Sequence, residues 1–446
     1  MMRIGSASSE LVAMFEWARA KALRLRHEGG SQGPVDVDEH RPEGTGQGRY
    51  LPSYWAGYAH RSGFYARDFA HQIVGAHLLG MAEANLTMLR CFAASATPEH
   101  GFHPVWAFNF DGSYLSIDYR GPGSFVRELP AVYELVEKAW AAYRWTWDRA
   151  YVEDPVLWSY YRNALTEIVP RATGKGIFQG VASYNELAGE HLAEAGDSVG
   201  SRYQAYLAMS ALSRARGLDG EDFAGRAAEL RRHFNEVWSV GENPADLVRG
   251  YTVDGAPVTG WGCENSWFMP LKDLIEPGPR NEAYLDFIDG QAAGPERPRN
   301  IEAYTYLPDT FFRHDRNAAA WRWMRHVFDR RAEPHVAGGL NGDYPEVSFT
   351  LVSQVVEGLL GVTPDVNAVT TLSRLPDDIA WAEVSGIPVG DGTITVRHDG
   401  RTATTLTNTS SDTTYRWQAR FPDAPAVVTH VAPGQSAQVT AAGRPG

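Results

Sequence analysis

Helical periodicity over most of the chain is the feature that most constrains its fold. Apolar residues recur at the three- and four-residue spacing of helices up to about residue 362. The clearest segments are 8–27, 68–95, 129–147, 154–169, 199–216, 220–238, 315–330 and 346–360, with weaker ones near 184–195, 264–275, 280–290 and 300–307. A dozen or so helices without alternating strands argue against a doubly wound sheet or a TIM barrel. The pattern predicts a mainly α protein with an (α/α)6 toroid of six helical hairpins over residues 1–370.

The pattern changes beyond Gly361. Residues 392–421 and 426–443 alternate apolar and polar side chains, are rich in Thr and Val, and contain the turn signals Asp399-Gly400 and Pro433-Gly434. This predicts a small C-terminal antiparallel β-domain over residues 371–446. Its sequence offers little chemistry, so we expect it to pack against the toroid.

Composition and motifs exclude several classes of function. Fifty-four acidic against 41 basic residues give a net charge of −13, which disfavours nucleic acid or an anionic membrane as a partner. Charged residues interrupt the first thirty positions, and no apolar run is long enough to span a membrane, so we expect a cytoplasmic protein. Cys91 and Cys263 lack metal or redox spacing, and no phosphate loop, GxSxG or HExxH motif is present. The sequence therefore predicts neither a cofactor nor a metal site, and it leaves the oligomeric state open.

Residues 29–48 form a long polar stretch after the first helix. They are rich in Gly, with Pro, Gln, Asp and Glu. Such a composition is typical of a mobile lid or of a disordered loop, and disorder is the expectation that composition favours.

Aromatic residues beside polar ones are the main positive signal. The chain has 14 Trp, 20 Tyr and 18 Phe, and many of them stand next to Gly, Asn, Asp or Glu. Such mixtures line carbohydrate clefts, because a flat ring packs on a sugar face while carboxylates and amides bind its hydroxyls. Core packing is the alternative explanation for most of these rings.

Two clusters of this kind lie in the first half of the chain. The first opens the helix at residue 68 and contributes the candidates Trp55, Tyr65, Arg67, Asp68 and His71. Asp68 is a candidate proton donor if apolar neighbours raise its pKa, or else only a helix N-cap. The second cluster contributes Glu186, either as a ligand for sugar hydroxyls or as the capping-box partner of Ser183.

Two further clusters lie in the second half of the chain. The loop 260–268 sets Glu264 and Asn265 between Trp261 and Trp267, and we expect it to line the site. The loop 338–349 contributes Asp343, Tyr344 and Glu346. Asp343 is a cap or a catalytic group, and Glu346 is a capping-box residue or a catalytic carboxylate.

At these residues the sequence resembles the six-hairpin glycosidases, and in particular the catalytic domain of the bacterial α-L-rhamnosidase type. The resemblance rests on the loop ending in Arg67-Asp68, the Trp261-to-Trp267 loop, the Gly-Asp-Tyr-Pro-Glu loop at 342–346, and Trp381-Ala382-Glu383-Val384 before a Gly-Thr-Ile strand. The chain begins almost directly at the toroid and lacks the group's Asp-Cys-Pro motif around Asp68. Another deoxy sugar or a uronic acid therefore remains as plausible a substrate as rhamnose.

The resemblance implies the chemistry. Enzymes of this type usually invert, with a general acid from the first half of the toroid and a general base from its last loop. By position these roles fall on Asp68 and Glu346, with Asp343 and Glu264 as substitutes. We therefore expect an exo-acting glycoside hydrolase whose partner is an oligosaccharide or glycoside. A polysaccharide lyase or unsaturated-uronyl hydrolase on the same fold, and a non-catalytic carbohydrate-binding protein, are the alternatives.

Overall fold

The structure of the 446-residue chain is a computed structural model. It describes residues 1–169, 183–184, 190–218, 220–241, 247–334, 343–422 and 424–442.

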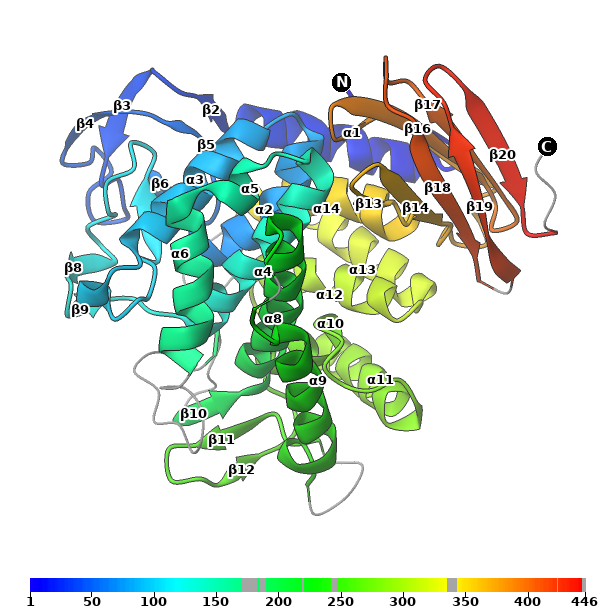
Figure 1. Ribbon diagram of the computed structural model, residues 1–446. Helices are drawn as coiled ribbons and strands as arrows, with labels where there is room; N and C mark the ends of the chain where they lie inside the picture. Colours follow the sequence, from blue (N-terminus) through cyan, green and yellow to red (C-terminus); the bar gives the residue numbers. More distant parts are fainter. Residues whose placement is uncertain are drawn as a thin grey trace.

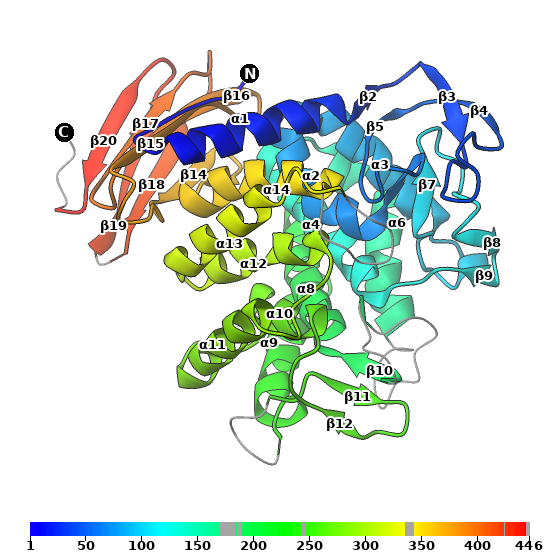
Figure 2. The same cartoon turned by 180° about the vertical axis from the view of Figure 1, so that it is seen from behind.

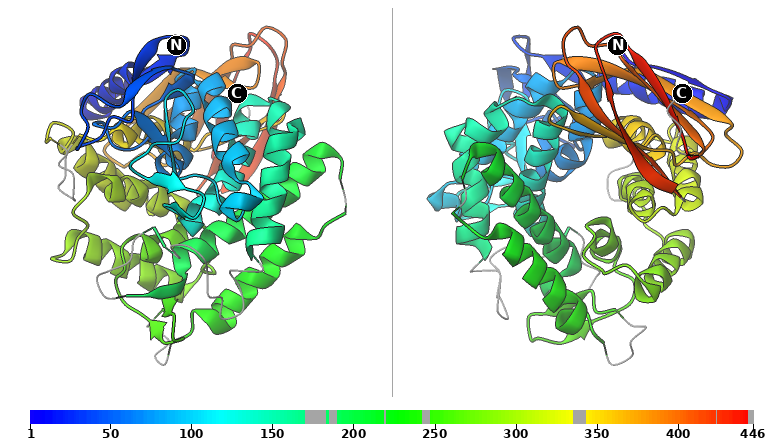
Figure 3. Two further views of the ribbon diagram at one scale, coloured as in Figure 1. Left: turned by 90° about the vertical axis from the view of Figure 1, so that its left-hand side faces the viewer. Right: turned by 45° about the vertical axis from the view of Figure 1, so that its right-hand side comes forward.

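Six helices form the inner ring of a toroid. They are α2 (Ala66–Leu78), α4 (Leu129–Thr146), α8 (Gly196–Arg216), α10 (Glu264–Leu271), α12 (Ile301–Arg313) and α14 (Pro345–Ser353). Each packs against the next in this order, and α14 packs against α2, so that the ring closes. Figure 3 shows the helices following one another around this ring.

A second set of helices alternates with the inner ones along the chain and packs outside them. This outer set consists of α1 (Ser9–Arg24), α3 (Ala82–Ser95), α6 (Pro155–Asn163), α9 (Phe223–His233), α11 (Pro279–Ala293) and α13 (Asn317–Asp329), with the short α5 (Ala150–Glu153) before α6. The helices α6, α9 and α14 each continue as a π-helical turn. Because outer and inner helices alternate, the inner helices run in one direction and begin at the same end of the barrel. The predicted (α/α)6 toroid is confirmed.

The residue pattern of each helix matches its layer. In the outer helix α1, buried Leu11, Met14, Phe15 and Ala18 recur at helical spacing, and the Ser8 side chain caps the first turn. In the inner helix α14 all nine residues are buried. A helix that is buried on every side belongs at the centre of a domain.

The C-terminal strands form two facing sheets, in the orders β1-β15-β16-β17-β20 and β13-β14-β18-β19. Their bounds are β1 (Arg3–Ser6), β13 (Thr363–Asp365), β14 (Ala368–Leu372), β15 (Trp381–Val389), β16 (Gly392–Asp399), β17 (Ala403–Asn408), β18 (Tyr415–Phe421), β19 (Ala424–Val431) and β20 (Ser436–Thr440). All neighbours in these sheets are antiparallel except β14 and β18. The expected small β-domain is therefore present, and Figure 1 shows it at one side of the toroid.

The N-terminus is part of this β-domain. Strand β1 pairs with β15, with Ile4 opposite Val384, and the chain then enters α1. Figure 2 shows α1 extending from the β-domain to β2 on the other side of the molecule. The β-domain also bonds the toroid directly, because Gly390 N donates to Trp145 O at 2.8 Å.

Short strands occupy the loops of the toroid. They are β2 (Arg26–Glu28), β3 (Gln32–Val35), β4 (Gly46–Arg49), β5 (Pro52–Tyr54), β6 (Gly63–Tyr65), β7 (Ala107–Asn109), β8 (Tyr119–Gly121), β9 (Ser124–Phe125), β10 (Leu192–Ala195), β11 (Gly250–Thr252) and β12 (Pro257–Val258), with a 3₁₀ turn over 98–100. Strand β6 leads directly into α2 and β10 into α8. Strands β6 and β10 therefore lie at the end of the barrel at which the inner helices begin.

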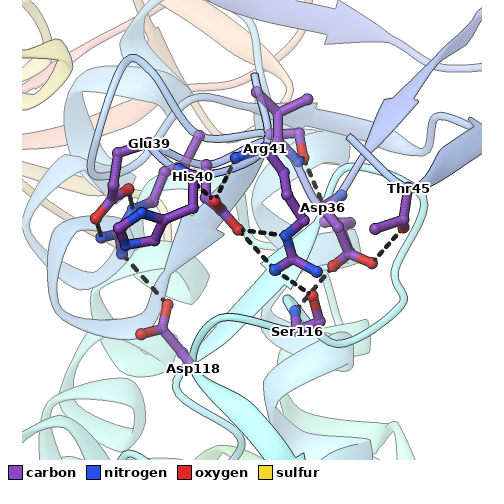
Figure 4. A network of polar contacts seen from close by, with 12 residues as sticks. Asp36, Glu39, His40, Arg41, Thr45, Ser116 and Asp118 are labelled. Carbon is purple, nitrogen blue, oxygen red and sulfur yellow. Dashed lines mark hydrogen bonds and ion pairs between the residues drawn. The ribbon is translucent and has the colours of Figure 1, made fainter. Parts of the chain in front are cut away.

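The expectation of disorder over residues 29–48 is wrong. Strands β3 and β4 form a hairpin, and polar side chains at its tip bond one another and the loop before α4 (Figure 4). Asp36 accepts hydrogen bonds from Ser116 N at 2.8 Å and Thr45 Oγ1 at 2.8 Å. Asp38 and Ser116 both bind the Arg41 guanidinium. The polar side chains that suggested disorder are hydrogen-bonded here, partly within the hairpin and partly to the loop before α4.

Candidate active site

One carboxylate stands at the start of every inner helix. These residues are Asp68 on α2, Glu128 at the N-cap of α4, Asp197 on α8, Glu264 on α10, Glu302 on α12 and Glu346 on α14, and we call them the acidic ring. Because the inner helices begin at one end of the barrel, the six side chains gather there. Their charges act on one another around the ring, from Asp68 to Glu128, Asp197, Glu264, Glu302 and Glu346.

Asp68 is a buried acid rather than a helix cap. The N-cap of α2 is Tyr65, and no side chain caps that helix. Asp68 is 7% exposed and accepts a hydrogen bond from Tyr344 Oη at 2.8 Å. Burial and then the charge of Glu346 raise the pKa of Asp68 to about 7, against the opposing effects of Arg67 and the Tyr344 hydroxyl. At neutral pH this carboxyl is therefore part protonated.

Glu346 is fully buried and binds a histidine. His71 Nδ1 lies 2.5 Å from Glu346 Oε1, and His71 Nε2 lies 2.8 Å from Asp309 Oδ2. Glu346 Oε2 has no hydrogen-bond partner among the described residues. The N-cap of α14 is Tyr344, with no side-chain cap bond, so neither Asp343 nor Glu346 caps this helix.

Arg67 brings a guanidinium group into the acidic ring. Its Nη2 donates to Glu264 Oε1 at 3.0 Å, and its Nε lies 3.4 Å from Tyr306 Oη. The guanidinium carbon also lies over the rings of Tyr184, at 5.1 Å, and Tyr306, at 5.5 Å. Arg67 and Glu264, both predicted site residues, are thus bound to each other inside the acidic ring.

Three members of the acidic ring escaped the sequence analysis. Burial raises the pKa of Glu302 and of Glu128 to about 8 each, and that of Asp197 to about 7. Glu128 accepts a hydrogen bond from Trp106 Nε1 at 2.6 Å, and Asp197 accepts one from Ser183 Oγ at 2.7 Å. Glu128 and Asp197 stand at helix starts without adjacent aromatic residues, whereas Glu302 has Tyr304 close by but lies in a stretch of weak helical periodicity. A search for a carboxylate at the N-cap or in the first turn of every inner helix would have found them.

Tyr65 and Trp55 donate hydrogen bonds to residues outside the acidic ring. Tyr65 is fully buried, and its hydroxyl donates to Asp118 Oδ2 at 3.0 Å. Trp55 is half-buried; its Nε1 donates to Arg61 O at 2.9 Å, and its ring packs against Phe110.

The residues of the Trp261-to-Trp267 loop lie partly in the acidic ring and partly in the core. Glu264 belongs to the acidic ring, and Asn265 accepts a hydrogen bond from Arg249 Nη1 at 3.0 Å. Trp267 is fully buried, with its ring 5.5 Å from that of Trp261. Trp261 keeps some exposed surface and donates to Glu296 O. A ring without exposed surface has no face for a sugar, so this structure gives Trp267 a place in the core.

The two remaining candidates lie apart from the ring or outside the described chain. Asp343 pairs with Lys21 Nζ on the outer helix α1 at 2.5 Å and is partly exposed. Glu186 lies outside the described residues, and its expected cap partner Ser183 donates a hydrogen bond to Asp197.

Three cavities are formed by described residues other than those of the acidic ring. One of about 660 Å³ lies beside Arg401 and Phe421, one of about 530 Å³ beside His77 and Trp147, and one of about 220 Å³ beside Trp238. None of the three is lined by a member of the acidic ring. Within the described ranges no group of three or more His, Cys, Asp or Glu residues is arranged to hold a metal, and no described helix is long and apolar enough to cross a membrane.

Comparison by sequence finds no matching family model and no matching curated protein. Comparison by structure finds the GH78 family rhamnosidase of Bacillus sp. GL1, with a TM-score of 0.64 and 13% identity over 95% of this chain. The α-L-rhamnosidase of Streptomyces avermitilis, solved with L-rhamnose, has a TM-score of 0.59 and 11% identity over 98% of this chain. A putative kojibiose phosphorylase from the human microbiome has a TM-score of 0.60 and 7% identity over 98%.

This chain spans only part of each of these proteins: 43% of the Bacillus rhamnosidase, 42% of the Streptomyces rhamnosidase and 63% of the phosphorylase. At these identities the likeness concerns the fold alone. The similar proteins have in common that their names describe enzymes acting on sugars.

Proposed function

We propose that this chain is a glycoside hydrolase that removes a terminal neutral sugar by carboxyl acid–base catalysis. The observation that carries the proposal is the pairing of Asp68, whose pKa is raised to about 7, with the histidine-bound Glu346 at one end of the toroid. Hydrolysis needs one protonated and one ionised carboxyl on opposite sides of the bond, and these two residues supply that combination.

In this proposal Asp68 is the general acid. It gives its proton to the glycosidic oxygen as the bond to the anomeric carbon breaks. A carboxyl with a pKa near the working pH is both protonated in part and able to release its proton, which suits this role. The Tyr344 hydroxyl on Asp68 Oδ1 then stabilises the carboxylate that remains.

Glu346 is the general base. Its Oε1 is engaged by His71, so Oε2, which has no partner among the described residues, accepts the proton of the attacking water. The water oxygen then bonds to the anomeric carbon. The charged His71 beside Glu346 provides a cationic partner for the carboxylate.

The charges of the site favour a neutral substrate. Among the described residues, Arg67 and His71 are the cations that contact the acidic ring, and both are already bound to carboxylates. A uronate or a phosphate ion would add negative charge to buried acids, and no cation in the described part of the chain that contacts the ring is free to balance it. This argues against a uronic acid substrate, against a lyase and against phosphorolysis. The two similar rhamnosidases favour a neutral deoxy sugar such as rhamnose.

Turnover on chromogenic glycosides tests the proposal. The panel contains the 4-nitrophenyl α-L-rhamnoside, β-D-glucuronide and several neutral hexosides, each with and without inorganic phosphate. We expect release of 4-nitrophenol from a neutral sugar and no acceleration by phosphate. A strict requirement for phosphate would replace hydrolysis by phosphorolysis, and cleavage of polyuronates with formation of an absorbing unsaturated product would identify a lyase. No turnover across the panel and on natural oligosaccharides would overturn the proposal.

The dependence of kcat on the leaving group distinguishes the role of Asp68 as acid from that of Glu346 as base. Asp68→Asn and Glu346→Gln should each reduce kcat by roughly 10²–10⁴-fold, because the amides keep the size of the side chain and cannot transfer the proton. With a 2,4-dinitrophenyl leaving group, which needs no protonation, Asp68→Asn should recover most of its rate and Glu346→Gln should not.

Asp343→Asn is the matched control, because Asp343 lies in the same loop but pairs with Lys21. It should keep nearly the wild-type kcat. If Asp343→Asn loses as much as Asp68→Asn, or if Glu302→Gln rather than Asp68→Asn shows the leaving-group recovery, the assignment of the acid is wrong.

A further inference from the structure

A chain of three side chains leads from Glu346 to the exposed surface. His71 bridges Glu346 and Asp309, at 2.5 Å and 2.8 Å. The exposed fraction of the side chain rises along this chain, from 1% at Glu346 to 9% at His71 and 32% at Asp309. The three residues come from three inner helices, α14, α2 and α12. The contact therefore joins the first inner helix of the ring to the last two.

Each ring nitrogen of His71 has a carboxylate as its nearest hydrogen-bond partner, and carboxylates accept hydrogen bonds when ionised. The Thr305 hydroxyl lies farther away, 3.5 Å from Nδ1, and donates to Glu302 O. Each ring nitrogen therefore donates, and the imidazole is in its charged form. Burial lowers the pKa of His71, but the charges of Glu346 and Asp309 outweigh this effect and raise it.

The orientation of the imidazole is fixed from two further directions. Its ring stacks on Tyr306 with centroids 3.8 Å apart and planes 11° apart. Asp309 is held in turn by Gln354, whose Nε2 donates to Asp309 Oδ2 at 3.1 Å and to Thr305 O at 2.7 Å. The histidine therefore cannot rotate without losing a stacking contact and two charge-assisted bonds.

We propose that His71 and Asp309 form a positioning pair that fixes the catalytic carboxylate of Glu346, with Oε1 held by His71 Nδ1–H and Oε2 left as the oxygen that takes the proton from water. This inference rests on the proposed function. In the step itself, one O–H bond of water breaks, its proton goes to Glu346 Oε2, and the hydroxyl oxygen bonds to the anomeric carbon. His71 keeps both of its protons, and Asp309 holds the ring in the required orientation.

Two substitutions of His71 separate positioning from packing. The amide nitrogen of Asn falls near the place of histidine Nδ1, and that of Gln falls near the place of Nε2. His71→Asn should therefore keep the bond to Glu346 and retain kcat within about 10-fold, while His71→Gln should lose at least about 100-fold, a loss typical of a disabled base. KM should change little in both, because the pair contacts the base and not the sugar. A role in packing alone predicts the opposite order, since Gln is closer to His in size, and that result would overturn the proposal.

Asp309→Asn tests the second member of the pair. It keeps the shape of the side chain but removes the charge that holds His71 Nε2–H, so kcat should fall with KM unchanged. Glu357→Gln is the control: this half-buried carboxyl lies on the turn after α14 and accepts a hydrogen bond from Trp145 Nε1 at 3.0 Å. It should keep kcat. An unchanged kcat in Asp309→Asn would overturn the role of Asp309.

A measurement without substrate separates this inference from the proposed function. A proton in a short charged hydrogen bond resonates far downfield, so the His71 Nδ1 proton should give such a signal in the NMR spectrum of the wild-type protein. The signal should vanish in Glu346→Gln and persist in Asp68→Asn. Its absence from the wild type would overturn the positioning pair even if glycosides are hydrolysed. Its presence in a protein that hydrolyses no glycoside would refute the proposed function and leave the contact established.

Discussion

At the scale of single residues, the acidic ring divides its carboxyls between charged and neutral forms. Glu264 and Glu346 each have a cationic partner, whereas Asp68 and Glu302 have pKa values raised to about 7 and about 8. When two carboxyls lie close together, repulsion between the two negative charges disfavours ionisation of both. The carboxyl with the weaker cationic partner therefore keeps its proton. The closeness of the carboxyls in the acidic ring thus accounts for both the protonated acid and the ionised base of the proposed reaction.

This division predicts the pH dependence of the rate. The reactive form has Asp68 protonated and Glu346 ionised, so kcat should fall as the pH rises through about 7, where Asp68 loses its proton. The observed midpoint belongs to the coupled ring rather than to one residue. In Asp68→Asn, assayed with the 2,4-dinitrophenyl substrate, the alkaline decrease should disappear. If the decrease persists unchanged in that variant, another group is the acid.

Sequence patterns located part of the site because some of its residues share a local signature. Arg67, Asp68, His71, Glu264 and Glu346 all stand near a helix start beside aromatic residues. Glu302 and Asp309 lie in a stretch whose helical pattern was weak, and their importance comes from residues more than 200 positions earlier. The position of Glu302 at a helix start is visible in the sequence, but the contacts that Glu302 and Asp309 make with the first inner helix are not.

At the scale of elements, the site depends on the close approach of α2 and α14. These helices carry Asp68 and His71 on one side and Glu346 on the other. Gly75 lies at their crossing, where an added Cβ would come within 2.1 Å of Phe349 O. The absence of a side chain at Gly75 therefore permits the spacing on which the contact of His71 with Glu346 depends.

The substitution Gly75→Ala tests this packing. Ala normally stabilises a helix interior relative to Gly, but here the methyl group must push backbone away, and overpacking of this kind destabilises by about 1–3 kcal/mol. Gly290→Ala in the exposed part of α11, where nothing lies within 4 Å, is the control and should stabilise by up to about 1 kcal/mol. Urea unfolding of both variants measures the difference. Equal stabilisation by the two substitutions would show that the crossing tolerates a side chain.

Elements formed from distant segments were the hardest to predict. Strand β1 has four residues, too few for an alternating pattern, and its partner β15 begins almost 380 residues later. The hairpin of β3 and β4 was missed for a related reason, since the residues that satisfy its tip, such as Ser116, lie outside it.

At the scale of the whole molecule, the toroid was predictable because the pattern of each of its helices lies within that helix's own sequence. Each outer or inner helix has its own periodicity, and the number of helices together with the absence of βαβ units selects the fold. The closure of the ring is not local. It brings α14 against α2, and only this closure places the carboxylates of the first and last inner helices together.

The acidic ring also makes the stability of the molecule depend on pH. Asp68 and Asp197 have pKa values raised to about 7, and Glu128 and Glu302 to about 8, so the folded protein holds protons that the unfolded chain has released above pH 5. Stability from such groups is lost as the pH rises through their folded pKa values. Below about pH 6.5 this trend is opposed by His77 and His398, whose pKa values are lowered to about 4 by burial, because the unfolded chain then binds protons that these histidines cannot.

Between pH 7 and 9 the histidines with lowered pKa values no longer oppose this trend, and His71, whose pKa is raised, acts in the same direction as the ring. The Tm from thermal unfolding should fall steadily across this window, and Glu302→Gln should flatten the slope, because an amide has no proton to lose. Asp412→Asn, on the exposed surface of the β-domain, should leave the slope as it is. A Tm that rises from pH 7 to 9 in the wild type would mean that these carboxyls are already ionised in the folded protein. A slope equally steep in Glu302→Gln would mean the same for Glu302.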